Sequence, residues 1–120
     1  MELSEVNAFS WCDIELERIA WECGGRDVVF YLFVPWEDPA LGGSRVLICR
    51  WARALFVRME FPDGHGGAPL TWGATFVEFS NNNYSVLIEF GGRGEIRLMC
   101  SEIEVIVRGA QSRHETNLSW

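Results

Sequence analysis

The chain has 120 residues, of which 48% are hydrophobic and 13% aromatic, so we expect one folded domain rather than a disordered segment. Ten basic residues stand against 17 acidic ones, and the net charge of −7 argues against nucleic-acid binding and favours a basic protein partner. No apolar run is long enough to span a bilayer, which argues against a membrane protein.

The N-terminus and the cysteines predict a cytoplasmic protein. Residues 1–11 have neither the basic start nor the apolar stretch of a signal peptide. Four cysteines, Cys12, Cys23, Cys49 and Cys100, are expected to be free thiols in a reducing compartment, the last two buried within strands. No two of them are close in sequence, so we expect no metal site and no other cofactor.

Residues 10–22 alternate between apolar and charged side chains, which predicts a strand. The alternation runs through Leu16 and resumes one residue out of phase at Ile19, which indicates a β-bulge. A helix is the alternative, because Trp11, Ile14 and Arg18 also fall at helical spacing.

Residues 28–34 are apolar on both faces of the expected strand, which predicts a position in the middle of a sheet. A glycine turn precedes this strand and Pro35 ends it. The alternative is that a partner chain covers its second face, which would make the protein a homodimer.

Residues 45–61 predict two successive strands or one long bent strand, with a break near residues 52–54. Their odd-numbered positions are nearly all apolar, including Trp51 and Val57, and are expected to face the core. Their even-numbered positions mix apolar and charged side chains.

The remaining pattern completes a β domain. Further strands are expected over residues 71–80, 84–90 and 96–107, the last with a second phase slip, and glycine or asparagine turns join them. We therefore predict an all-β, mainly antiparallel fold: a seven- to eight-stranded meander forming a sandwich or partial barrel, with at most a short N-terminal helical turn. Residues 1–120 form a single β domain with a core of residues 10–108 and a polar tail of residues 109–120.

Two groups of residues are candidates for binding a protein partner. Asp13, Glu15 and Glu17 would form a negative stripe on one strand face. Trp36 stands in a loop beside Glu37 and Asp38, like an aromatic recognition anchor with an acidic rim. The alternatives are that the acids form a solvated face and that Trp36 closes one end of the core.

Three features were weighed for other functions. His65 lies near Asp63 in a glycine-rich loop, but no third catalytic partner accompanies the pair in sequence. The thiols of Cys12 and Cys23 have no rigidly held base, so we predict that the chain is not an enzyme. A barrel pocket for a small ligand would be lined by aromatic side chains, namely Phe30, Trp51, Trp72 and Phe76.

The order of these features resembles a diffuse group of small bacterial β domains whose first strand carries a His-Asp-x-Glu motif. Asp13 and Glu15 match that motif, and Cys12 stands where the group has histidine. Residues 45–60 resemble the third strand of the group and residues 95–106 its C-terminal strand. Some members are immunity proteins of polymorphic toxin systems.

The resemblance implies a cytoplasmic, non-catalytic immunity protein that neutralises a cognate bacterial toxin. The partner would be a basic toxin domain, and no nucleic acid or membrane would be bound. A small-ligand-binding barrel, a subunit of a larger bacterial assembly and a small enzyme stay open as alternatives.

Overall fold

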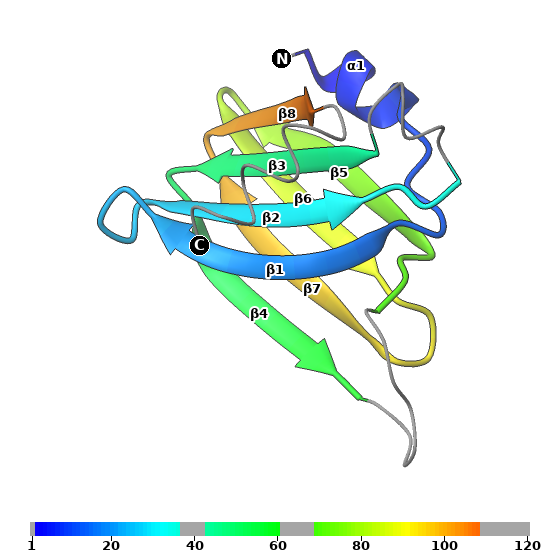
Figure 1. Ribbon diagram of the computed structural model, residues 1–120. Coiled ribbons are helices and arrows are strands. Elements are labelled where there is room, and N and C mark those ends of the chain that lie inside the picture. The colour runs from blue at the N-terminus through cyan, green and yellow to red at the C-terminus, as the bar shows by residue number, and fades with distance from the viewer. Residues whose placement is uncertain (1, 37–42, 61–68, 109–120) are drawn as a thin grey trace.

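The computed structural model describes residues 2–36, 43–60 and 69–108, which form one short helix and eight strands in two sheets (Figure 1). The elements are α1 (Leu3–Ala8), β1 (Glu15–Glu22), β2 (Asp27–Phe33), β3 (Ser44–Arg50), β4 (Arg53–Met59), β5 (Gly73–Ser80), β6 (Asn83–Glu89), β7 (Gly94–Cys100) and β8 (Glu102–Arg108). The first sheet has the order β1-β2-β3-β8, and the second has the order β4-β7-β6-β5. Neighbouring strands within each sheet are antiparallel, so the predicted all-β antiparallel fold is confirmed.

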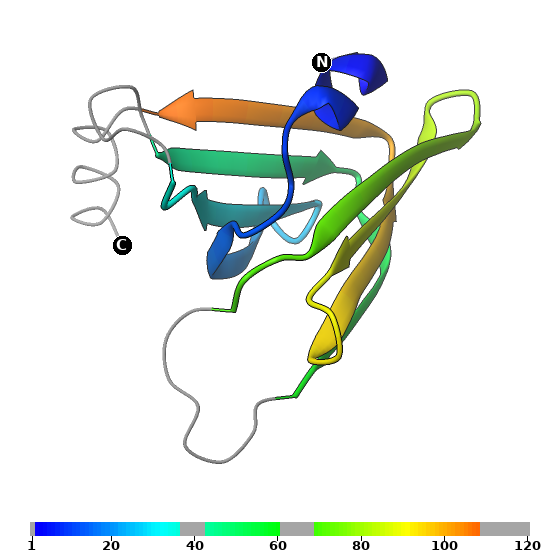
Figure 2. The same ribbon diagram turned by 90° about the vertical axis from the view of Figure 1, so that its right-hand side faces the viewer.

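The strand order departs from a simple meander at two places. β4 pairs with β7 instead of with β5, and β8 returns to pair with β3. These pairings arise because β3–β4 and β7–β8 act as two long strands that bend together from one sheet into the other. Figure 2 shows the two sheets meeting along this bend and diverging away from it.

The bend has a local cause in each long strand. Trp51 adopts a left-handed backbone (φ 58°) between β3 and β4, and Ser101 separates β7 from β8. The Ser101 amide donates a hydrogen bond to the Arg50 carbonyl (2.9 Å), which keeps the two strands paired through the corner. The break predicted within residues 45–61 and the predicted second phase slip both fall at this corner.

β1 confirms the predicted strand and its bulge. The register with β2 shifts between Leu16 and Arg18, so the alternation resumes one residue later. The strand begins at Glu15 rather than near residue 12, because Asp13 has a left-handed backbone (φ 61°) that interrupts extended structure.

The core lies between the facing sides of the two sheets. β2 lies inside its sheet, between β1 and β3, as the sequence predicted. Its inward side chains are buried together with those of both long strands and of the second sheet. The largest fully buried side chains are Phe30, Phe76, Leu47, Ile88 and Ile96.

Of the odd positions of residues 45–61 that were expected to face the core, Trp51 and Val57 are not buried, although Val57 does point to the inward side of its sheet. Leu47 and Cys49 are fully buried in β3, but Trp51 is 56% exposed at the corner and Val57 is 45% exposed in β4. The physical reason is that β4 is an edge strand, so its inward face is covered from one side only.

Two segments close the space between the sheets. α1 packs against β5 and β8, the edge strands that the two sheets present on that side (Figure 2). On the other side, residues 69–71 run beside the start of β1, where the Leu16 amide donates to the Pro69 carbonyl (2.9 Å).

Several predictions concern residues outside the described ranges, namely Glu37, Asp38, Asp63, His65 and the tail of residues 109–120. Within the described ranges, α1 has six residues, and no helix has the length and apolarity needed to cross a bilayer.

Candidate functional site

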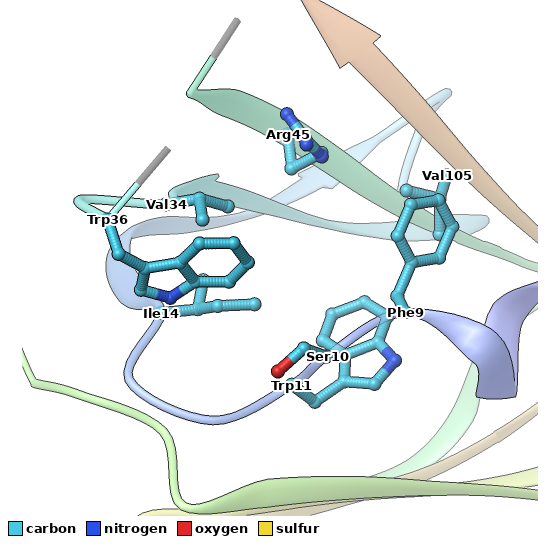
Figure 3. Close-up of a pocket in the computed structure, with 8 residues that line it drawn as sticks. All are labelled: Phe9, Ser10, Trp11, Ile14, Val34, Trp36, Arg45 and Val105. Atoms are coloured by element: carbon cyan, nitrogen blue, oxygen red, sulfur yellow. The ribbon is translucent and has the colours of Figure 1, made fainter. Parts of the chain in front are cut away.

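An apolar pocket opens at the end of the first sheet where β1 begins and β2 ends (Figure 3). Its walls come from the segment after α1, from the end of β2 and from β3 and β8; the lining residues are Phe9, Ser10, Trp11, Ile14, Val34, Trp36, Arg45 and Val105. Its volume is about 30 Å³. Pockets for small-molecule ligands usually measure ~300–1,000 Å³, so this one has room for the tip of a single side chain.

The floor of the pocket is fixed by Trp11, which is 8% exposed. Its indole Nε1–H donates to the Val6 carbonyl (2.9 Å), which ties the segment to α1. The ring packs edge-on against Phe9 (6.2 Å between centroids) and at a tilt against Phe76 in the second sheet (5.1 Å). A tryptophan with its ring packed and its N–H bonded is rigid, so the pocket is largely preformed.

A buried threonine holds the backbone beneath the pocket. The Thr71 hydroxyl, 1% exposed, donates to the Trp11 carbonyl (2.5 Å) and accepts from the Ile14 amide (3.1 Å). Its backbone also donates to the Ile14 carbonyl (3.0 Å) and accepts from the Asp13 amide (2.7 Å). One residue of the segment that leads into β5 therefore positions the whole turn that leads into β1.

Trp36 forms one wall of the pocket at its rim. The indole lies beside Ile14 and Val34 (Figure 3) but is still 58% exposed. Of the two interpretations of the sequence, closing the core and anchoring a partner, the first predicts a covered ring. The observed ring lines a pocket and leaves more than half of its surface in solvent.

The structure brings the predicted acids to the same end of the sheet as Trp36. Asp13 and Glu15 flank the pocket residue Ile14, and Glu15 pairs with Phe33 at the end of β2. Glu17 lies in the bulge of β1, two residues after Glu15. The three acids do not form the regular stripe that the sequence predicted, because Asp13 precedes the strand and Glu17 falls in the register shift.

Of the eight residues that line the pocket, only Trp36 was predicted from the sequence as a site residue. Phe9 belongs to the segment after α1, for which no site was predicted. Arg45 lies across the pocket from Trp11 (Figure 3), and its guanidinium donates to the Ser44 carbonyl (3.2 Å). No local signal in the sequence marks these residues, because the pocket joins side chains from separate segments of the chain.

The four aromatics proposed to line a ligand cavity do not share one. Phe30 and Phe76 are fully buried in the core, whereas Trp51 and Trp72 are 56% and 71% exposed. A second hollow of about 320 Å³ is polar and lies where β3 and β8 meet the β5–β6 turn. Its Arg50 pairs with Glu104 (3.4 Å) and Glu102 (3.8 Å), so these lining charges already bind one another.

An ion pair stabilises the corner between the sheets. Arg26 donates two hydrogen bonds to the Asp27 carboxylate (2.9 and 3.0 Å), which also accepts from the Trp51 amide (3.3 Å). The Arg26 guanidinium, with the Trp51 amide, lowers the pKa of Asp27 from 3.8 to about 2, against the opposing effect of burial. The guanidinium also lies over the Trp51 ring (5.0 Å), so these groups serve the fold.

The four cysteines fall into two classes. Cys12 and Cys23 are exposed, and Cys49 and Cys100 are buried as predicted; all four are free thiols. A hydrogen bond with Cys100, together with burial, raises the pKa of Cys49 well above its usual value. Among the described residues, no three histidine, cysteine or acidic side chains gather where they could hold a metal ion.

Comparison with known proteins gave no match: no protein-family model matches the chain, and no curated protein matches it.

Proposed function

We propose that this chain is a non-catalytic protein-binding module that docks a basic protein at the pocket end of its first sheet. The observation that carries the proposal is the exposed Trp36, which lines a small apolar pocket; Asp13 and Glu15 are the chain neighbours of the lining residue Ile14. We further propose, from the resemblance of its strand motifs, that the partner is a bacterial toxin that the chain neutralises as an immunity protein.

The chemistry of this end of the molecule defines the partner surface that fits it. The pocket volume of about 30 Å³ accepts the tip of one apolar side chain. Asp13 and Glu15, on either side of the lining residue Ile14 in the chain, favour lysine or arginine on the partner, and the net charge of −7 would speed the approach of a basic domain. A nuclease toxin, whose own substrate is polyanionic, presents such a basic surface.

The size of the pocket also favours a protein over a small ligand. A side-chain tip gains its affinity from the surface around the pocket, here the Trp36 indole and the preformed floor at Trp11. A free small molecule would be left mostly in solvent in a space of this size.

The proposal is tested by affinity capture from the native cell with five tagged baits, the wild type and four variants. Trp36→Ala removes the anchor, and a Glu15→Lys/Glu17→Lys double variant reverses the charge beside the pocket. Trp21→Ala is the matched control, because Trp21 is 52% exposed against 58% for Trp36. A Glu78→Lys/Glu89→Lys control changes the net charge equally, on exposed positions of the second sheet.

We expect a basic protein that is captured by wild type and by both controls and lost with both site variants. Truncating a central interface tryptophan typically costs at least about 2 kcal/mol, so the affinity of Trp36→Ala should fall about thirtyfold or more. The captured protein should arrest growth when it is expressed alone and be harmless when it is expressed with this chain. Capture that is equal for all baits would refute the site, and a harmless partner would refute the immunity role.

A further inference from the structure

The edge strand β4 exposes an apolar surface that its own sheet does not cover. Every residue of Arg53–Met59 is exposed or half-buried. Leu55, Val57 and Met59 point to the inward side of the sheet, as shown by the pairing of Val57 with the buried Ile96. Exposed apolar edge strands are prone to pair with other strands, so β4 is a candidate for pairing with a strand of another chain.

The hydrogen-bond pattern of β4 shows which of its backbone groups face β7 and which face away from the sheet. The Glu60 amide donates to the Arg93 carbonyl (2.6 Å), so this pair is a hydrogen-bonded pair of the antiparallel ladder. Such pairs alternate along a ladder. The backbone groups of Arg58 and Phe56 therefore face β7, and those of Val57 and Met59 face away from the sheet.

We propose that β4 pairs with β4 of a second copy of this chain, antiparallel and with the two-fold axis at Val57. In this register the outward amide of each Val57 donates to the outward carbonyl of the Val57 in the second copy. The two second sheets thereby join into one continuous sheet of eight strands. An isologous contact of this kind closes on itself and forms a dimer rather than a filament.

The side chains of β4 are complementary to themselves in this register. Val57 meets Val57 and Leu55 meets Met59 on the inward side, so apolar surface covers apolar surface. On the outward side, Phe56 of each copy lies opposite Arg58 of the other copy. Aromatic and arginine side chains attract one another, and Phe56 already has the Arg97 guanidinium over its ring (4.7 Å).

The register shifted by one residue, with its axis at Arg58, is worse for the charges of this strand. A two-fold axis at Arg58 would set the two Arg58 side chains against each other, and like charges opposite one another destabilise a sheet. The arginines of β4 would also repel a generic basic strand, whereas the Val57 register places each Arg58 on an aromatic ring. The observations therefore favour a second copy over an unrelated strand as the occupant.

The test is the molar mass of the full chain, measured by light scattering from low micromolar to near-millimolar concentration. Wild type should approach twice 13.7 kDa as concentration rises. Val57→Pro removes the outward amide without touching a bond to β7 and should weaken dimerisation at least about tenfold. Val57→Lys places a charge on the inward face and should do the same, whereas Val77→Lys is the control, because Val77 is 48% exposed against 45% for Val57.

Amide hydrogen exchange distinguishes a dimer formed through β4 from a dimer formed through any other surface. It also tests the proposal if Val57→Pro fails to fold. The amides of Val57 and Met59 should gain protection as concentration rises, and those of Phe56 and Arg58 should not change. A wild type that stays monomeric throughout would overturn the proposal. So would a dimer that Val57→Lys forms as well as Val77→Lys, or Val57 exchange that does not depend on concentration.

Discussion

Replacing Thr71 with valine removes the hydroxyl that holds the turn beneath the pocket and keeps the shape of the side chain. The Trp11 carbonyl and the Ile14 amide each lose a hydrogen-bond partner at a buried site. A buried polar group left unpaired costs ~1–3 kcal/mol, so two of them should lower the free energy of unfolding by about 3 kcal/mol. For a domain of this size that is a fall of about 10 °C in Tm.

Thr71→Ser is the matched control for this prediction. It keeps the hydroxyl and loses one buried methyl group, which costs about 1 kcal/mol. Urea unfolding, followed by tryptophan fluorescence and far-UV circular dichroism, gives the free energies of all three proteins. The expected order of stability is wild type, then Thr71→Ser, then Thr71→Val. A Thr71→Val protein as stable as Thr71→Ser would refute the role assigned to the hydroxyl.

Three further predictions concern the corner and the strands. The pKa of Asp27 is lowered from 3.8 to about 2 in the folded state, so its ion pair adds at most about 2 kcal/mol to the free energy of unfolding above pH ~4. This advantage over Asp27→Asn should vanish as the pH falls to about 2, and urea unfolding across that pH range measures it. Gly94→Ala should unfold or detach β4, because a Cβ there would lie 1.8 Å from the Arg58 carbonyl oxygen, whereas Gly92→Ala, with no atom within 4 Å, should change thermal stability little. Intact-mass analysis after alkylation should find the two exposed thiols modified in the native protein and all four only after unfolding, and rapid native modification of the buried pair would contradict its packing.

The strands were predictable because each carries its own signal. The phase slip between Leu16 and Ile19 became a bulge, and the apolar run of residues 28–34 became an inner strand. A break was also predicted, near residues 52–54; in the structure it begins at Trp51, whose left-handed backbone ends the strand. Side-chain period and turn chemistry are local properties, and they were sufficient for these elements.

The candidate site was only partly predictable. Asp13, Glu15 and Trp36 were recognised by residue type, and the fold places them at one end of the first sheet. Phe9 and Arg45 were not recognised, because nothing in their own neighbourhood in sequence distinguishes a pocket wall from a lead-in segment or a surface arginine.

The fold class, a count of seven or eight strands and a break within residues 45–61 could be predicted from the sequence, because the period of two, the phase slips and the glycine turns are local features of short stretches of chain. Which strands became edges depended on the tertiary structure. Val57 has the same pattern as Leu47, yet Leu47 is fully buried and Val57 is 45% exposed, because β3 lies between two strands and β4 has a neighbour on one side alone. Strand order depends on contacts between distant segments, and those same contacts built the pocket and left the β4 edge open.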